Sequence, residues 1–462
     1  MADSQSPVRK VVWSELLPWL ILFRSVRIAL MARVLVLGAI GLILTTLGWR
    51  AIGWTFSGTD DLVVDDWNRA ARTWLWEDAT PGDPSGGFSI DTTAESASEV
   101  FASASEGLRW APIEVWLFLI RPFQDLFDAR LTPGGFVCLL LACVWELLVW
   151  GIVGGAIARI AALKYTRDEA PGFVAALKHS LGKLPSYSLA PLIALAGAAV
   201  FAIQLFVLGL IMNVSILAVL AALAWPFVLV LGLLMAILLL GALVGWPLMW
   251  ATVAVEGTDA FDALSRSYAY TYQRPWRLLW YVAFSVFLAA VSMFVVKAFA
   301  ISAVRLGDWS ISWGLTDENR PELLGPRESA TASNAAAPLL APPFQPDNVD
   351  LPTPTAEPAP ATDPWTIRTS QKLIYFWQSL WKSLAAGYQA AFIWVSAVGI
   401  YLLLRRDIDG AEMDEVFVGQ EDERGIPALD LDESTGVPEV APSRPAQAGD
   451  AGDAAQAPPS KL

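Results

Sequence analysis

The chain has 462 residues, of which 55% are hydrophobic and 16% are charged, with a mean hydropathy of +0.48 and a formal net charge of −14. This composition excludes an ordinary soluble protein, because soluble domains carry roughly 25% charged residues and long uncharged apolar runs are typical of membrane spans. One histidine and two cysteines exclude most metal sites, disulfide frameworks and histidine-dependent catalytic triads.

Residues 1–33 are predicted to be a cytoplasmic amphipathic segment, whose helix over 12–33 lies at the membrane interface. A secretory signal is the alternative interpretation, because basic residues precede the apolar run 16–23. That run is short, is followed by three arginines, and has no small-residue cleavage site after it. The segment is therefore expected to lead directly into the first span, from Val34 to about Trp54.

Four further spans are recognised as apolar runs of about 21 to 24 residues, enough to cross roughly 30 Å of hydrocarbon at about 1.5 Å per residue. They are predicted at 136–158, 189–212, 278–301 and 384–404. Basic residues flank most of these runs at one end, which is typical of the cytoplasmic ends of spans.

The stretch 184–255 has 72 residues without a single Asp, Glu, Lys or Arg, so the spans within it are difficult to separate. With an outer turn at Asn213, residues 216–255 remain, and as one straight helix they would be about 60 Å long. They form either two spans or one tilted span with a kink and an interfacial extension. Pro226 and Pro247 are the positions where such a helix would bend or break.

The distribution of charge decides between six and seven spans. With six spans, the basic clusters at 9–33, 159–183, 266–277 and 405–406 all face the cytoplasm, as the positive-inside rule requires. With seven spans, the last two clusters would lie outside. We therefore predict an all-α polytopic transmembrane helical bundle with six spans and both termini in the cytoplasm, located in the bacterial inner membrane.

The predicted membrane domain covers residues 34–304, with spans one to five and an acidic outer cap at 55–131. Within the cap, residues 113–126 are apolar on most of their circumference and are predicted to form a helix at the outer surface or packed on the bundle. Residues 305–364 are rich in proline and alanine and are predicted to be a flexible outer loop. An interfacial helix and span six follow at 365–406.

The last segment, 407–462, is predicted to be an acidic, disordered cytoplasmic tail. It holds 14 acidic and 3 basic residues and contributes −11 to the net charge, whereas the rest of the chain contributes only −3. The tail is a candidate docking site for a basic protein partner, with a solvated spacer as the alternative. The basic loops are expected to face anionic membrane lipids, and no nucleic acid or cofactor is expected to bind.

Two short stretches, 176–180 and 263–267, share Ala, Leu and Ser at equal positions and are offset by 87 residues. Each follows a turn that contains a glutamate, is short and basic, and precedes a membrane span. A span–loop–span unit used twice is the simple interpretation, and paired repeats are common in transporters. Chance similarity between two amphipathic helices that lead into spans is the alternative.

Several stretches carry a resemblance to a known family: GGAIARIAA at 154–162, SLAPL at 188–192, GWPL at 245–248, EGTDAFDALSRSY at 256–268 and EMDEVF at 412–417. Together they resemble an uncharacterised family of bacterial multipass membrane proteins, best known from planctomycetes. The resemblance implies a fold type and a membrane location but no activity. The loop around 256–268 is also similar to the membrane domain attached to some glycerophosphodiester phosphodiesterases, whose catalytic domain is soluble and has no counterpart here.

Glu146 is the most unusual residue of the chain, because it lies near the middle of span two, where an ionised carboxylate costs a few kcal/mol or more. It is expected to be protonated, paired or in contact with water. The functional interpretation makes it a proton or cation relay, and the structural one makes it a group hydrogen-bonded to a neighbouring helix. Lys297 in span five is a candidate partner, although its depth favours snorkelling to the headgroups.

Gly151 and Gly155, four residues apart in span two, are predicted to seat another helix closely. Cys138 and Cys143 are expected to be inert apolar side chains within the same span. The sequence shows no phosphate-binding glycine loop, nucleophile elbow, Cys/His metal spacing or pair of catalytic carboxylates. No catalytic residue, metal site or enzymatic activity is therefore predicted.

Two functions from different classes remain. The first interpretation is a membrane scaffold or accessory subunit that binds a partner through its acidic tail. The alternative is a small-solute or proton-coupled transporter that uses Glu146. The sequence leaves the oligomeric state open.

Overall fold

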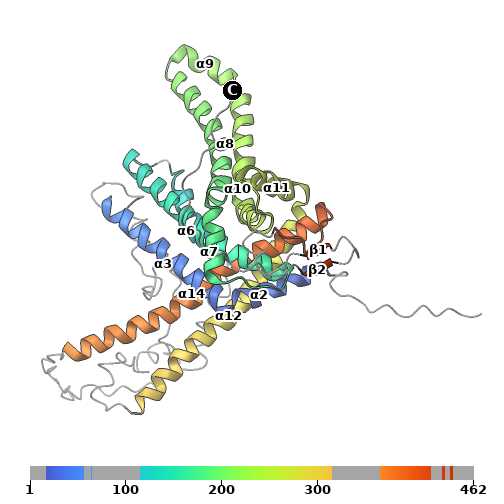
Figure 1. The fold of residues 1–462 in the computed structure, drawn as a ribbon. Coiled ribbons are helices and arrows are strands. Elements are labelled where there is room, and N and C mark those ends of the chain that lie inside the picture. The colour runs from blue at the N-terminus through green and yellow to red at the C-terminus, as the bar shows by residue number, and fades with distance from the viewer. Residues whose placement is uncertain are drawn as a thin grey trace, which may run out of the picture. The chain divides into compact units, whose positions relative to one another are not determined.

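The computed structural model describes residues 17–56, 64, 115–128, 130–314, 365–417, 429–431 and 438–440. Its main helical elements are η1 (Pro18–Leu22), α2 (Phe23–Ala29), α3 (Ala32–Thr55), α6 (Pro133–Thr166), α7 (Phe173–Gly182), α8 (Leu184–Ile211), α9 (Ser215–Leu223), α10 (Trp225–Glu256), α11 (Ala260–Gln273), α12 (Pro275–Ser312) and α14 (Trp365–Ile408) (Figure 1). Residues 115–125 form a further helix.

Six helices in the described part of the chain are long and apolar enough to cross a membrane. They are α3, α6, α8, α10, α12 and the part of α14 from Lys372 to Ile408. The predicted fold class, an all-α polytopic helical bundle, is confirmed. The chain is a multipass membrane protein.

Successive spans alternate in direction, so the segments predicted to be basic inner loops meet at one end of the bundle, which we call the basic end. Arg33 at the start of α3 donates to the carbonyl of Ala170, just beyond α6, at 2.9 Å. Lys183, directly before α8, donates to the carbonyl of Gly257, directly after α10. Arg277 at the start of α12 pairs with Asp407 at the end of α14. Each span thus begins or ends at this end.

The stretch left open by the sequence, 216–255, forms one long span and a short extension. α9 is a separate helix of 9 residues, and α10 continues for 32 residues. Pro226 lies in the first turn of α10, where a missing backbone N–H costs nothing, and Pro247 lies inside the helix. The structure therefore has the single-span form of the two alternatives. α8, α9 and α10 make a hairpin that extends away from the other spans (Figure 1).

Several predicted boundaries differ from the observed ones. The interfacial helix expected over 12–33 is instead η1 followed by α2, separated from α3 by an extended residue at Met31. α12 continues to Ser312, into the predicted flexible loop, and the two segments expected at 365–406 are one helix of 44 residues. The hydropathy of a helix reports its length inside the membrane, so it underestimates helices that continue beyond.

The end of the chain forms a second compact unit, Val416–Leu462. Two strands, β1 (Leu429–Leu431) and β2 (Pro438–Val440), pair antiparallel within it, with Leu429 opposite Val440. These strands and residues 407–417 are the described parts of the predicted tail, and its other residues lie outside the described ranges. Most of the predicted acidic cap and of the proline-rich loop lies outside the described residues, as do residues 1–16.

Candidate functional site

Four tryptophans form a layer in the core of the bundle. The rings of Trp250 on α10 and Trp394 on α14 stack with their centroids 4.4 Å apart, and Trp150 on α6 lies 5.9 Å from Trp394. Trp246, one turn before Trp250, lies 5.6 Å from it. Gly154 makes this layer possible, because a Cβ at that position would lie 2.9 Å from the Trp250 ring. We call these four residues the tryptophan layer.

Glu146 lies one helical turn before Trp150 on the same face of α6 and is 0% exposed. Neither of its carboxyl oxygens has a hydrogen-bond partner among the described residues. Gly41 of α3 contacts the Trp150 ring, and Trp49 of α3 packs with Ala142. Glu146 lies between Ala142 and Trp150 on α6, so α3 passes it on one side of the core.

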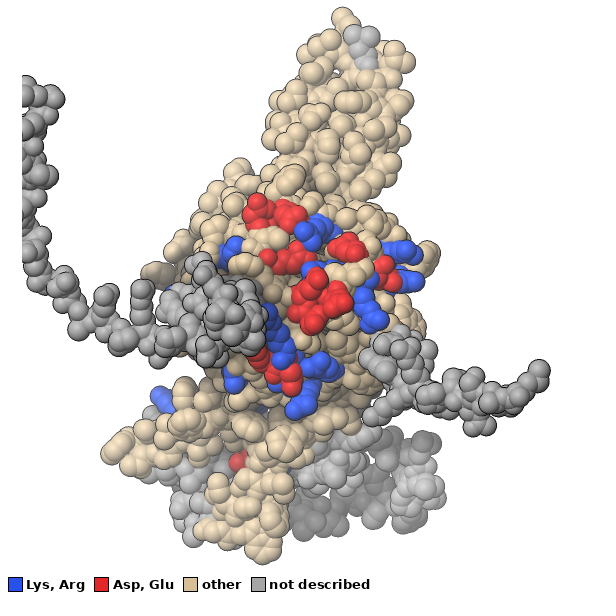
Figure 2. Space-filling view, turned by 45° about the vertical axis from the view of Figure 1, so that its right-hand side comes forward, with Lys and Arg blue, Asp and Glu red and all other residues tan. Residues whose placement is uncertain are grey.

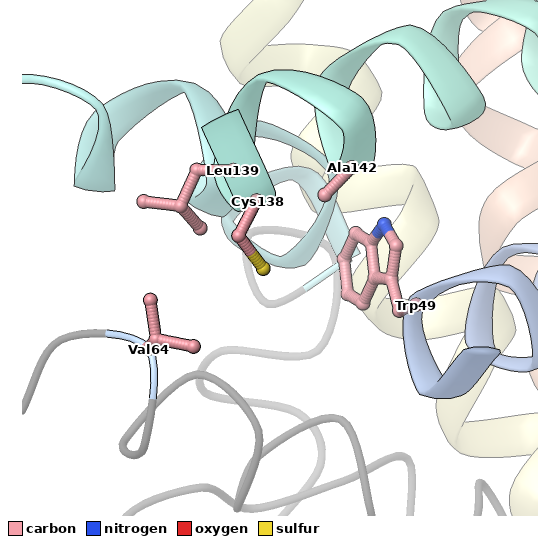
Figure 3. Close-up of a cluster of buried hydrophobic side chains, with 5 residues drawn as sticks. All are labelled: Trp49, Val64, Cys138, Leu139 and Ala142. Carbon is pink, nitrogen blue, oxygen red and sulfur yellow. The ribbon is translucent and has the colours of Figure 1, made fainter. Parts of the chain in front are cut away.

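The helix over residues 115–125 packs against the bundle near the level of Glu146. Phe118 contacts Trp49 with a centroid distance of 4.8 Å, and Phe123 contacts Trp246 at 5.4 Å. Of the two positions predicted for this helix, the surface or the bundle, these contacts favour the bundle. Figure 3 shows the apolar cluster beside it, in which Trp49 lies near Cys138 and Ala142 of α6.

Lys297 makes no hydrogen bond to Glu146. It is 8% exposed, which differs from the snorkelling that its depth suggested. One turn further along α12, Ala300 and Ile301 pack against Ala385 of α14, so α14 covers this part of α12. A second lysine, Lys382 of α14, is also buried, at 5% exposure. The sequence did not single out Lys382, because its helix was expected to lie at the interface.

Gly151 and Gly155 lie where α6 meets the next two helices. A Cβ at Gly151 would be 2.9 Å from Leu184 of α8, and a Cβ at Gly155 would collide with Ser180 of α7 and lie 2.9 Å from the Tyr187 ring. Both positions therefore have the close helix approach for which small residues were proposed. Cys138 and Cys143 are both buried.

The two members of the sequence repeat occupy corresponding places. Ser180 of α7 donates to the carbonyl of Gly151 at 2.8 Å, and Ser267 of α11 donates to the carbonyl of Gly245 at 2.8 Å. In each case a short helix folds back on the preceding span, and the next span begins with a proline in its first turn. The units α6–α7–α8 and α10–α11–α12 therefore share a local construction and a direction through the membrane.

A network of charges at the basic end joins three helices. Glu256 at the end of α10 pairs with Arg266 of α11 at 2.7 Å and with Arg405 of α14 at 3.1 Å. The hydroxyl of Tyr401 donates to the same carboxylate at 2.6 Å. Figure 2 shows acidic and basic side chains mixed on this part of the surface, whereas the hairpin above it is free of charge. The sequence identified the basic residues but not this acceptor.

Two further arginines connect neighbouring segments at the basic end. Arg159 is buried and donates to the carbonyl of Ala254 at 3.0 Å, near the end of α10, where a cation complements the helix dipole. Arg24 pairs with Asp168 at 3.2 Å. A hydrogen bond from Lys164 holds the pKa of Asp168 below its usual range, so this carboxylate stays ionised at neutral pH.

The described residues contain no group of three or more His, Cys, Asp or Glu side chains that could hold a metal ion. No family model, curated protein or solved structure matches the chain. The resemblance to a bacterial multipass family therefore stays an expectation.

Proposed function

We propose that this protein is a transporter of a small solute in the bacterial inner membrane and that Glu146 carries a proton or cation during transport. The observation that carries this proposal is the complete burial of Glu146, whose two oxygens have no hydrogen-bond partner among the described residues. An unsatisfied buried carboxyl group costs several kcal/mol, so a position that keeps one is a candidate for a functional group.

The surroundings of Glu146 support the proposal. The tryptophan layer lies one turn further along α6, and the indole N–H groups of Trp150, Trp246 and Trp394 are buried without acceptors in the described part of the chain. This part of the core therefore holds both an acceptor group and donor groups without partners. A bound proton, water molecule or small polar solute satisfies such groups.

The repeated construction of the two three-helix units gives separate support. Parallel repeats related by an axis along the membrane normal occur in several transporter folds, with the binding site near the middle of the membrane. When Gly151 is placed on Gly245, Glu146 corresponds to Leu240 of α10. An acidic group at this position is thus present in only one of the two units.

The proposal is tested with the purified protein in lipid vesicles that enclose a pH-sensitive dye. When the outside pH is lowered, vesicles that contain the wild type are expected to acidify faster than vesicles without protein. Vesicles that contain Glu146→Gln are expected to lose most of this proton flux. Glu169→Gln, which removes a carboxylate beyond the end of α6, is the matched control and should keep the wild-type rate. A folded Glu146→Gln variant with unchanged flux contradicts the proposal.

Binding of the proton itself can be measured without transport. The infrared spectrum of the wild type should contain a band from a protonated, buried carboxyl group that Glu146→Gln lacks. An unchanged spectrum in Glu146→Gln would exclude a protonated Glu146 as its source. No enzymatic reaction is part of this proposal.

A second function, a membrane scaffold or accessory subunit, is favoured by the C-terminal segment. Residues 407–462 carry −11 charges, and Val416–Leu462 forms a compact unit separate from the bundle. A basic protein is the partner that complements this negative charge. Pull-downs in native lipid should recover such a partner with the full chain and lose it when residues 418–462 are removed, and equal recovery from both forms contradicts this second function.

A further inference from the structure

The α8–α9–α10 hairpin is the part of the bundle least covered by the rest of the protein. Only 11% of the most apolar stretch of α8 is buried inside the protein, and the same share is buried in α10, whereas the share in α14 is 94%. The buried residues of α8 end at Ala198, so the half of the helix from there to Ile211 packs only partly against α10. In a membrane, this half faces lipid or another protein.

Gln204 lies in this uncovered half and is exposed. Its neighbours on the same side of α8 are apolar and exposed, among them Val200 and Val207. The amide nitrogen of Gln204 donates to the carbonyl of Val200 at 3.3 Å, within its own helix. No hydrogen bond to its side-chain oxygen is recorded in the described part of the chain. Lipid chains offer no donor for that oxygen and no acceptor for the second amide proton.

We propose that a second copy of this chain docks on the face of α8 around Gln204, and that the two Gln204 carboxamides hydrogen-bond to each other. Across a two-fold axis along the membrane normal, a residue that lies near the axis meets the same residue of the second copy at the same depth. A carboxamide carries both a donor and an acceptor, so it complements itself across such an axis. Glutamine is among the residues that hold membrane helices together.

The second copy fits this surface better than an unrelated partner. A different protein would have to place a matching polar group at the same depth of its own span, whereas a second copy does so by symmetry. The stretch 184–255 has no charged residue, so no repulsion opposes the approach of two identical hairpins. The proposal is independent of the role of Glu146 and survives if transport is not observed.

Disulfide trapping in native membranes tests the contact. Cys138 and Cys143 are both buried, and replacing them with alanine gives a background without thiols. Gln204→Cys in this background is expected to form a cross-linked dimer on mild oxidation. Phe206→Cys is the matched control, because it is exposed at nearly the same depth but about 200° around the helix. Equal cross-linking at both positions, or none at Gln204→Cys, overturns the proposal.

A second measurement asks whether the carboxamide itself stabilises the dimer. Gln204→Leu is expected to lower the dimerisation constant in lipid bilayers roughly tenfold, the size expected for two hydrogen bonds between membrane helices. Gln204→Asn keeps a carboxamide and should retain most of the affinity. A monomeric wild type at all densities, or a Gln204→Leu variant that dimerises as well as the wild type, contradicts the proposal.

Discussion

At the scale of single residues, the bundle depends on glycines whose neighbours pack so closely that no side chain would fit. Gly155→Ala places a methyl group against Ser180 and Tyr187, neither of which can move without disturbing α7 or α8. We expect a loss of about 1–3 kcal/mol in the free energy of unfolding, typical of overpacking in a dense core. Thermal unfolding in detergent measures it.

Gly209→Ala is the matched control for this substitution. Gly209 also lies inside a helix, α8, but nothing lies within 4 Å of a Cβ built there. Alanine is the better helix former by roughly 1 kcal/mol, so this variant should melt at or above the wild-type temperature. Equal destabilisation by both substitutions would show that Gly155 is not a site of close packing.

The unusual nature of Glu146 was predictable from sequence alone, whereas its surroundings were not. A charged residue in an apolar run of span two stands out by composition. Only the packing of α10 against α14 brings Trp250 and Trp394 together in the core near it. Residues far apart in the chain make this layer, so no local pattern reveals it.

At the scale of elements, the two repeat units predict paired effects. Ser180→Ala and Ser267→Ala each remove a buried hydrogen bond to a glycine carbonyl of the preceding span. Each variant should lose about 1 kcal/mol of stability, and the double variant should lose the sum, because the two sites share no partner. Denaturation curves in detergent measure both. A large effect at one serine and none at the other would argue against equivalent units.

The helix over residues 115–125 covers a natural reporter. Phe118 packs against the cluster that contains Cys138, and Cys138 is 0% exposed. Phe118→Ala should open a route to this thiol and increase its labelling by a maleimide at least several-fold. Removing a buried aromatic side chain leaves a cavity and loosens the cover.

Phe136→Ala is the control for the labelling experiment. Phe136 lies on α6 only two residues before Cys138, but it is exposed and points away from the cluster. Its removal should leave the labelling rate unchanged. Rapid labelling in the wild type would contradict the cover that residues 115–125 provide.

At the scale of the whole molecule, the sequence predicted the number of spans because two independent signals agreed. Hydropathy located the apolar runs, and the basic clusters required an even number of crossings. Helix ends were less predictable, as the continuous α14 shows, because a helix does not stop where its hydropathy falls. The ion pair between Glu256 and Arg405 was not predictable, because it joins residues well over a hundred positions apart.

The positive-inside rule predicts the orientation of the six spans, and a reporter fusion measures it directly. A reporter that is active only in the cytoplasm should be active when fused after Gly257, at the basic end. The same reporter fused after Asn213, between α8 and α9, should be inactive. Activity at Asn213 and none at Gly257 would reverse the orientation, and activity at neither site would contradict the topology.

The lengths of α12 and α14 have a consequence for the surrounding bilayer. With 38 and 44 residues, these helices are about 57 Å and 66 Å long, roughly twice the thickness of the hydrocarbon core. A helix of this length cannot lie wholly inside the hydrocarbon core when it crosses the membrane. Only the apolar runs 278–301 and 384–404 match the hydrocarbon core, so the additional turns of both helices extend past the core on the side away from the basic end.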